Sequence, residues 1–395
     1  MAKESTLEII HCWRTKSERK ALDFLLDLFR YENPEITIID NTFGNIAEVK
    51  TIVKEKIINK QPPDTFQNTY GPGVIRSWKP YLEPINELFE SFPISGTLKK
   101  WGKVGANYYS LPLNLHRDNN LWVNMKLADK LGIEMPLESV NDFFKACEKI
   151  KKKGYIPFVF GTKGQNFWLN WIFEWFILSA TGDGNYLNKF YLGKAKPARD
   201  SVIEKALLLF KELWEKFVNP SWDALTWNEA GDVLLRDEGV FNVMGDWQKA
   251  HFMASGWKPC KDFGFQTTPE TDGISIIHGN CFGLTKNAPH PNATLKFLKM
   301  LKTIKAEEKF CEIKSASPPR MDCPLGRFDS MQKEIIKYIR SDELIPSVLG
   351  LADFWINETG NIFESFCKTL DIDSTLAKLN AAYEWTFLHG GVGSS

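Results

Sequence analysis

The side chains with the most capacity for chemistry in this chain are aromatic and amide residues. Its 395 residues include 14 tryptophans, 10 tyrosines and 28 phenylalanines. Four tryptophans are expected at the ends of elements rather than in mid-helix stripes: Trp13, Trp168, Trp227 and Trp247. Polar residues stand in mainly apolar or turn contexts at Gln67, His116, Arg117, Asn119 and Lys314. Because indole faces stack on the C–H faces of polar ligands and amides bridge hydroxyl groups, this mixture favours carbohydrate binding.

Sequence motifs for catalysis and for cofactors are missing. The chain has no Gly-x-x-x-x-Gly-Lys-[Ser/Thr] loop for phosphates and no Gly-x-Gly-x-x-Gly turn for a dinucleotide. It also has no His-Glu-x-x-His zinc motif and no Gly-x-Ser-x-Gly nucleophile elbow. The spacing of its cysteines and histidines does not suit zinc. The sequence therefore predicts no cofactor, no metal site and no enzyme.

A glycosidase with two carboxylates is an alternative that spacing alone leaves open, because its two acids can be distant in sequence. Glu18, Glu174 and Asp246 are candidates for such a pair. Each has a simpler interpretation, as a helix-surface charge, a buried structural acid or a turn cap.

Charge and hydropathy narrow the class of partner. Lysine plus arginine and aspartate plus glutamate each number 49, so the formal net charge is zero and no basic field attracts nucleic acid or anionic lipid. The most apolar stretch, residues 167–180, is 14 residues long and contains Asn170 and Glu174. Spanning a bilayer takes about 20 apolar residues, so this stretch predicts a buried helix.

Cysteine usage and the chain ends bear on the compartment. None of the seven cysteines forms a Cys-x-x-Cys pair, although Cys311 and Cys323 are near enough in sequence to be bridged. The chain opens without an apolar signal region, and its final Gly-Gly-Val-Gly-Ser-Ser sequence is typical of a flexible or trimmed tail. A protein whose targeting and anchoring segments have been removed has these features, and so does a cytosolic protein.

The first part of the chain alternates strand and helix. Hydrophobic patterning predicts strands at residues 7–11, 36–39 and 65–67, and helices at residues 17–31 and 46–58. This order indicates a parallel sheet with right-handed crossovers. Ligands bind such sheets at the carboxyl ends of the strands, where Trp13 and Gln67 are expected.

A more helical region follows residues 121–124, and residues 240–247 read as a strand that ends in a glycine turn. Residues 283–304 return to the style of the first part. The length exceeds one ordinary core, and no linker, internal repeat or low-complexity run is visible. The sequence therefore predicts two lobes between which the chain passes more than once.

Five stretches carry a resemblance to a known family by their sequence, order and spacing. They are residues 11–18 (HCWRTKSE), 62–67 (PPDTFQ), 111–124 (LPLNLHRDNNLWVN), 242–247 (NVMGDW) and 314–320 (KSASPPR). Together they resemble the extracellular solute-binding proteins (family 1) of ATP-driven carbohydrate importers, in the glucose/mannose-type branch. The resemblance covers residues 7–350.

The resemblance implies roles for individual residues. Trp13 and Trp247 would stack on a sugar ring, and Trp227 would supply a further aromatic face from the second lobe. The hydroxyl groups would be bonded by Glu18, Gln67, His116 and Lys314. The simpler interpretations are that Trp13 is a core residue, that Gln67 is an amide satisfied by backbone, and that Lys314 is a surface charge.

Three positions depart from the family pattern. Cys12 stands where the family often has a second tryptophan, Asn280 where it tends to carry an aspartate, and Gly350 where it has a histidine. We keep Asn280 among the binding residues as an amide in place of a carboxylate. The departures leave open the choice among a glucose epimer, a pentose and a disaccharide.

The fold implied is α/β, of the two-lobed type II periplasmic-binding-protein class, with discontinuous lobes joined by a hinge. Lobe I is expected to comprise residues 1–117 and 270–321, and lobe II residues 118–269 and 322–395, with the sugar site in the cleft between them.

The function implied is capture of a neutral monosaccharide, glucose or a close epimer, by hinge closure. A monomeric receptor would deliver the sugar to membrane permease subunits that a separate ATPase drives. It would act outside the cytoplasmic membrane, in the periplasm or at the cell surface, held there by a tether that this chain lacks. The alternatives are a glycosidase with an aromatic cleft and a cytosolic sugar sensor.

Overall fold

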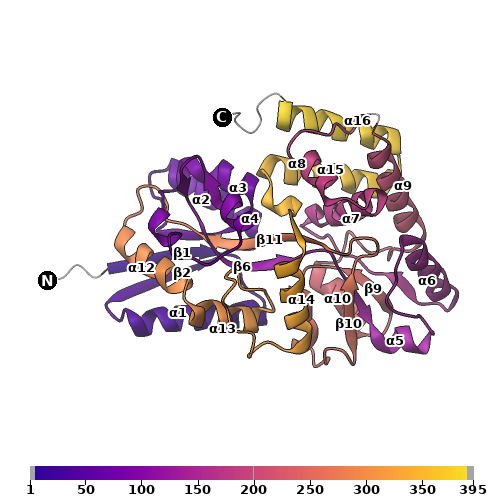
Figure 1. Cartoon of the computed structure of the whole chain (residues 1–395), viewed down its shortest axis with the longest axis horizontal. Helices are drawn as coiled ribbons and strands as arrows, with labels where there is room; N and C mark the ends of the chain where they lie inside the picture. The colour runs from indigo at the N-terminus through magenta and orange to yellow at the C-terminus, as the bar shows by residue number, and fades with distance from the viewer. Residues whose placement is uncertain (1–4, 199, 389–395) are drawn as a thin grey trace. The chain divides into compact units, whose positions relative to one another are not determined.

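The structure is a computed structural model that describes residues 5–198 and 200–388. The chain divides into two units, each built from two separate segments (Figure 1). Unit 1 contains residues 1–116 and 278–340, and unit 2 contains residues 117–277 and 341–395. The chain therefore passes between the units three times, at 116/117, 277/278 and 340/341.

The sheet of unit 1 is built around β1 (Ser5–His11), which pairs in parallel with β2 (Ile36–Thr42) on one side and β3 (Thr65–Tyr70) on the other. Beyond β3 lies the antiparallel strand β11 (Ile274–Phe282), through residues 279–282, and β6 (Leu111–Arg117) also pairs with β11. The parallel strands predicted from sequence are confirmed.

The helices α1 (Lys16–Glu32) and α2 (Ile46–Ile58) follow β1 and β2. The first connection moves the chain outward from β1 to β2, and the second returns it past β1 to β3. Right-handed crossovers, which are the rule for parallel strands, would place the two helices on opposite faces of the sheet, and Figure 1 shows α1 and α2 on opposite faces. The strand order thus reverses between β1 and β3, which is where open α/β sheets form a binding crevice.

The described residues of unit 1 form seven α-helices, and the last residue of α14 lies just past the third crossing. Besides α1 and α2, they are α3 (Pro72–Trp78), α4 (Gly96–Gly102), α12 (Pro291–Leu301), α13 (Ile304–Lys314) and α14 (Ser330–Ser341). The hairpin of β4 (Lys103–Val104) and β5 (Asn107–Tyr108) follows α4. Against α1 pack α13 and α12, which close the core beneath β1. The described residues of this unit thus bury an apolar stripe of α1 formed by Ala21, Leu22, Leu25, Leu26, Leu28 and Phe29.

The last crossing lies further along the chain than the predicted boundary after residue 321. Helix α14 belongs to unit 1 because Gln332 donates to the Ala316 carbonyl at 3.0 Å. At the other end of α14, Arg340 donates to the carbonyl of Cys323 at 3.2 Å. The second crossing likewise lies at 277/278 rather than at 269/270, because β11 continues from one unit into the other.

Unit 2 contains a sheet in the order β10 (Phe263–Thr267), β7 (Asn120–Asn124), β9 (Gly239–Val243) and β8 (Ile156–Phe158). The first two pairings are antiparallel and the last is parallel. Separately, β12 (Glu343–Pro346) pairs in parallel with residues 274–277 of β11. All residues of β7 and β9 are buried, as strands covered on both faces must be.

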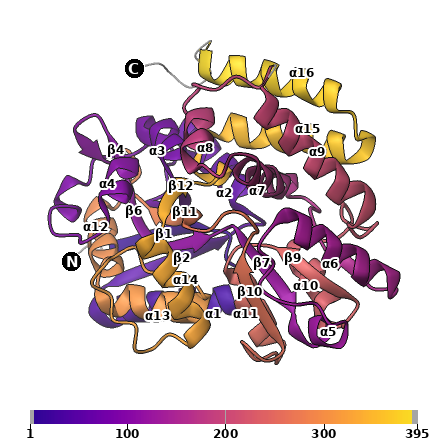
Figure 2. The same ribbon diagram turned by 45° about the vertical axis from the view of Figure 1, so that its right-hand side comes forward.

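Helices make up most of unit 2. Around the sheet lie α5 (Met125–Lys130), α6 (Val140–Lys152), α10 (Trp227–Leu235) and α11 (Trp247–Ala254). A second layer, gathered in one region of Figure 2, consists of α7 (Leu169–Thr181), α8 (Gly184–Tyr191), α9 (Ser201–Lys216), α15 (Asp353–Thr369) and α16 (Ile372–Tyr383). Residues 169–178 of α7 are all buried, as predicted for the apolar stretch. Across the described ranges, no helix is long and apolar enough to span a membrane.

Candidate functional site

A series of hydrogen-bonded side chains in unit 1 joins the residue after β1 to the middle of β3. Gln67 accepts from the Cys12 backbone N–H at 3.0 Å and donates to Asn280 Oδ1 at 2.8 Å. Asn280 in turn donates to Asn114 Oδ1 at 3.3 Å. The predicted residues Gln67 and Asn280 are therefore direct partners, although 213 positions separate them.

Two side-chain amide nitrogens among or beside these hydrogen-bonded residues have no hydrogen-bond acceptor within the described ranges. The Nδ2 atoms of Asn68 and Asn114 are buried, and no described residue accepts a hydrogen bond from them. A buried donor left unsatisfied costs about 1–3 kcal/mol, so a ligand oxygen that reached it would gain a comparable free energy. Sequence analysis missed both residues, although Asn68 adjoins Gln67 and Asn114 lies within one of the stretches that carried the resemblance.

An ion pair joins the start of α1 to the end of α13. The Lys314 ammonium lies 3.0 Å from Glu18 Oε1, and its side chain is only 3% exposed. The other carboxylate oxygen of Glu18 accepts from the Thr15 hydroxyl at 2.9 Å, as part of a capping box. Burial raises the pKa of Glu18, but the charge and hydrogen bond of Lys314 outweigh it, and the pKa lies below its usual value.

Trp13 lies beside this pair and is buried in unit 1. Its indole contacts Phe282 and Phe310 at ring-centroid distances of 5.9 and 5.2 Å. The Lys314 ammonium lies 6.0 Å from the centre of the same indole, within cation–π range. Lys314 therefore connects Trp13 with Glu18, and its interpretation as a solvated surface charge is wrong.

His116 is the last residue of unit 1 before the first crossing, and it is buried. Its ring lies 5.4 Å from that of His278, which follows the second crossing. Burial, followed by the charges of Lys314 and His278, holds the pKa of His116 well below its usual value. His116 is therefore neutral near pH 7, and a neutral imidazole can both donate and accept hydrogen bonds from hydroxyl groups.

Unit 2 contributes a cluster of indoles around Trp247. The ring of Trp247 lies 5.8 Å from Trp168, 5.7 Å from Trp171 and 6.4 Å from Trp227. It folds over Gly245, where an added Cβ atom would lie 2.1 Å from the indole, so only glycine leaves room for it. The sequence had suggested that Trp247 ends the preceding strand. In the structure that strand ends at Val243, and Trp247 is the first residue of α11.

Two polar groups adjoin the tryptophan cluster. His251 lies 5.7 Å from the Trp227 ring, and its Nε2 atom lies 2.8 Å from Asp232 Oδ1. Gln248 is fully buried, and neither side-chain amide atom has a hydrogen-bond partner among the described residues. Sequence analysis missed Gln248, and its place beside Trp247 was the available signal. It also did not single out Trp171, which lies three positions after Trp168.

The predicted residues of unit 1 thus lie in three sets: Gln67 with Asn280, Lys314 with Glu18 and Trp13, and His116, whose pKa is lowered in part by the charge of Lys314. The two predicted residues of unit 2 lie in one cluster. Comparison with known proteins shows the family of the chain. Residues 16–308 match the family described as bacterial extracellular solute-binding protein. The chain belongs to this family.

Relatives and solved structures agree with that assignment. An uncharacterized ABC transporter extracellular-binding protein of Pyrococcus horikoshii is 31% identical over 388 residues, which cover 94% of this chain and 86% of the relative. A probable sugar-binding periplasmic protein of Mesorhizobium japonicum is 26% identical over 76% of this chain and 68% of its own.

Two solved structures show the fold. The bacterial solute receptor AcbH matches with a TM-score of 0.85 at 16% identity, over 99% of this chain and 100% of the receptor. A chitin oligosaccharide binding protein matches with a TM-score of 0.86 at 16% identity, over 98% and 100%. The prediction of a two-lobed α/β fold of the type II periplasmic-binding class is therefore confirmed.

Two of the three acids considered for a glycosidase, Glu18 and Glu174, have structural partners in this solute-binding protein. Glu18 is paired with Lys314. Glu174 is fully buried, and its Oε1 atom accepts from the Tyr191 hydroxyl and, at 2.6 Å, from the Val348 backbone N–H. Among the described residues, no group of three or more histidine, cysteine or acidic side chains could hold a metal ion.

The family departures also find a structural account. The Cys12 thiol donates to Gln67 Oε1 at 3.4 Å, and burial raises its pKa to about 12, so it is a neutral small residue. Gly350 ends a single buried turn at Val348–Gly350. None of the seven cysteines, all of which lie in the described ranges, forms a disulfide, and Cys311 and Cys323 are both buried.

Proposed function

We propose that this protein is the sugar receptor of an ATP-driven importer and that it captures a neutral monosaccharide, glucose or a close epimer. The tryptophan cluster of unit 2 carries the proposal, because indole faces are the surfaces on which sugar C–H faces stack. Support comes from the relative named as a probable sugar-binding periplasmic protein and from AcbH, a solute receptor described as having an exclusive preference for β-D-galactopyranose.

The residues of unit 1 supply the complementary chemistry. Gln67, Asn280 and the neutral His116 offer donors and acceptors without net charge, and the Glu18–Lys314 pair offers one charge of each sign. Such a set suits hydroxyl groups better than a phosphate or a carboxylate, because the negative charge of either anion would be repelled by the Glu18 carboxylate. In this proposal side chains of both units bind one sugar, and Trp13, Trp227 and Trp247 supply its aromatic contacts.

Capture would proceed by rotation about the three crossings, with the sugar-bound form presented to membrane permease subunits. A ligand drives such a change only if it binds the closed form more tightly than the open one. Energy would come from a separate ATPase, since the chain contains no phosphate-binding loop. We propose that the protein works outside the cytoplasmic membrane and is tethered there.

A thermal-shift screen tests this function. Glucose, mannose, galactose, xylose, arabinose and several disaccharides would be compared with an amino acid, a sugar phosphate and a nucleotide. A ligand at a hundredfold excess over Kd stabilises the native state by about 2.7 kcal/mol, so a hexose should raise the melting temperature clearly. A shift with the amino acid or the nucleotide and none with any sugar would overturn the proposal. Recovery of the sugars unchanged separates a receptor from a glycosidase.

A further inference from the structure

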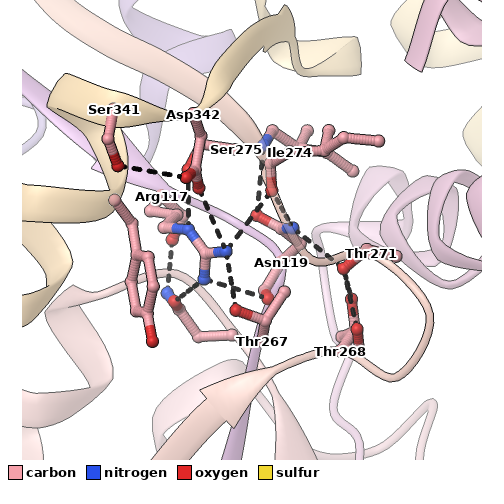
Figure 3. Close-up of polar contacts among 12 residues, drawn as sticks. Arg117, Asn119, Thr267, Thr268, Thr271, Ile274, Ser275, Ser341 and Asp342 are labelled. Carbon is pink, nitrogen blue, oxygen red and sulfur yellow. Dashed lines mark hydrogen bonds and ion pairs between the residues drawn. The ribbon is translucent and has the colours of Figure 1, made fainter. Parts of the chain in front are cut away.

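The three crossings between the units meet in one buried polar network on the unit 2 side. Arg117 is the first residue of unit 2 after the first crossing, and Ile274 and Ser275 lie shortly before the second. Asp342 follows the third crossing. Figure 3 shows these residues gathered around the Arg117 guanidinium, although they come from distant parts of the sequence.

Arg117 is fully buried, and each of the three nitrogen atoms of its guanidinium group donates a hydrogen bond. Nε donates to Ser275 Oγ at 2.9 Å. Nη1 donates to Asn120 Oδ1 at 2.8 Å, and Nη2 donates to Thr267 Oγ1 at 3.0 Å and to the Ile274 carbonyl at 3.4 Å. Since a guanidinium has five N–H donors in a rigid plane, these bonds fix both its position and its orientation.

Asp342 joins the third crossing to the other two. Its Oδ2 atom accepts from Ser275 Oγ at 2.7 Å and lies 3.9 Å from Arg117 Nη2. Directly after it, the Glu343 N–H donates to the Gly273 carbonyl at 2.9 Å, where β12 begins to pair with β11. Ser275 therefore contacts the charged residues of both neighbouring crossings.

Asn119 strengthens the link between the first two crossings. Its Nδ2 atom donates to the Ile274 carbonyl at 2.9 Å, and its Oδ1 atom accepts from the Ile276 N–H at 3.1 Å. The Asp118 N–H donates to the Ile276 carbonyl at 2.8 Å. Side chain and backbone thus hold the chain after the first crossing against the chain before the second.

A network of this kind is an inefficient way to stabilise a core. A buried ion pair loses its hydration, and apolar residues of the same volume often stabilise a fold equally well or better. What the network provides is geometry, because directional bonds hold three chain segments in one arrangement. All three segments are the ones through which unit 2 is connected to unit 1.

We propose that Arg117, Ser275 and Asp342 form a crossing clamp that makes the unit 2 ends of the three connections move as one piece. Rotation between the units is then confined to the boundaries at 116/117, 277/278 and 340/341. The clamp sets sugar affinity by positioning the connections, without touching the sugar. The inference rests on the proposed function, since sugar capture is the process that it tunes.

The test compares two clamp variants with a control from the same unit. Asp342→Asn removes the charge and keeps the shape, and Ser275→Ala removes the bridging hydroxyl. The control is Asn219→Ala, which removes a buried amide that accepts from the Phe160 N–H at 2.7 Å and has no bond to the clamp. Sugar affinity is measured by calorimetry, association and dissociation rates by tryptophan fluorescence, and the ligand-induced change in radius of gyration by X-ray scattering.

We expect both clamp variants to weaken sugar binding by about three- to tenfold and to change the radius of gyration less on sugar addition than the wild type does. The control should lose melting temperature and keep wild-type affinity. Wild-type affinity and scattering in both clamp variants would overturn the inference, and so would an equal loss of affinity in the control. If Asp342→Asn does not fold, the result for Ser275→Ala alone tests the inference.

Failure of the proposed function has a different result, because the wild-type protein would then bind no sugar. In that case X-ray scattering of the ligand-free clamp variants and the ligand-free wild type tests the clamp. A loosened clamp should broaden the distribution of interatomic distances in the variants, and an unchanged distribution would contradict the inference.

Discussion

Unit 1 and unit 2 present different physical means of binding a ligand. The predicted residues of unit 1 are already bonded to one another, through Gln67 with Asn280 and Glu18 with Lys314. The tryptophan cluster of unit 2 offers apolar ring faces, which need no bond partner. An intramolecular hydrogen bond contributes only about 0.5–1.5 kcal/mol net, whereas a central aromatic anchor is worth about 2 kcal/mol or more.

This contrast suggests a division of labour. Ring faces accept any sugar with a flat C–H face, so unit 2 would supply most of the affinity. Directional bonds reject an epimer whose hydroxyl leaves a buried group unpaired, so unit 1 would supply the discrimination. The predictions below test the division in order of decreasing effect.

The largest effect is expected from Trp247→Ala. It should weaken binding of the preferred sugar at least roughly thirtyfold, or about 2 kcal/mol, because a central indole is lost. Calorimetry across several hexoses measures the change, which should be similar for all of them. Loss for one epimer alone would show that unit 2 also discriminates.

Trp247→Ala will also destabilise the free protein. Truncation of a core aromatic residue typically costs ~3–5 kcal/mol of stability. Trp247 is only 9% exposed and packs against three other tryptophans, so the loss should approach that range. The matched control is Trp355→Ala, which removes a buried indole that packs against Phe190 and Tyr383 in the same unit. The control should lower the melting temperature without changing sugar affinity.

Lys314→Met is expected to have the next largest effect and to depend on the sugar. Hydrogen bonds from a charged donor contribute about 1.5–3 kcal/mol, so affinity for the preferred hexose should fall roughly tenfold or more. Epimers that lack the bonded hydroxyl should lose much less. Equal losses for all epimers would contradict the role of unit 1 in discrimination.

A double variant separates binding from folding at this position. Removing Lys314 leaves the Glu18 carboxylate without its ion-pair partner, so the pKa of Glu18 should rise and the melting temperature should fall. Adding Glu18→Gln removes the unpaired charge and should restore part of the melting temperature but none of the affinity. If affinity recovers together with the melting temperature, Lys314 acts only through stability.

Local patterning predicted much of the fold. The bounds of α2 match those predicted from its helical period, because a clear period in a helix depends on near neighbours alone. The contact of Gln67 with Asn280 spans 213 positions, and packing of Trp13 on Phe310 joins the loop after β1 to α13. Local sequence patterns cannot predict such contacts, because they depend on the tertiary structure. The sequence analysis assigned Trp13, Gln67 and Asn280 to one site only through the family resemblance. The start of α11 at Trp247 was missed because the preceding apolar strand appeared to continue.

The smallest effect on binding, and the clearest on pH dependence, is expected from Glu174→Gln. Glu174 lies in α7, which also carries Trp171 of the tryptophan cluster. Burial, and after it the negative charge of Asp118, raises the pKa of Glu174 to about 8, although bonds from Tyr191 and Val348 act in the opposite direction. An ordinary glutamate has a pKa near 4.3, so the folded state holds a proton here that the unfolded state has released.

Stability must therefore fall as pH rises from about 4.5 to about 8, because the unfolded state binds fewer protons in that range. The Glu174→Gln side chain keeps an oxygen that can accept from Tyr191 and Val348 and has no proton to lose. Its melting temperature should exceed that of the wild type at pH 8.5 by several degrees and should approach it at pH 5. Sugar affinity at pH 6 should stay within about twofold, since the change leaves both the indole faces and the polar residues of unit 1 in place. A pH profile of the variant parallel to that of the wild type would mean that Glu174 is ionised in the folded protein. A large loss of affinity at pH 6 would mean that the acid, and not the indoles alone, prepares unit 2 for the sugar.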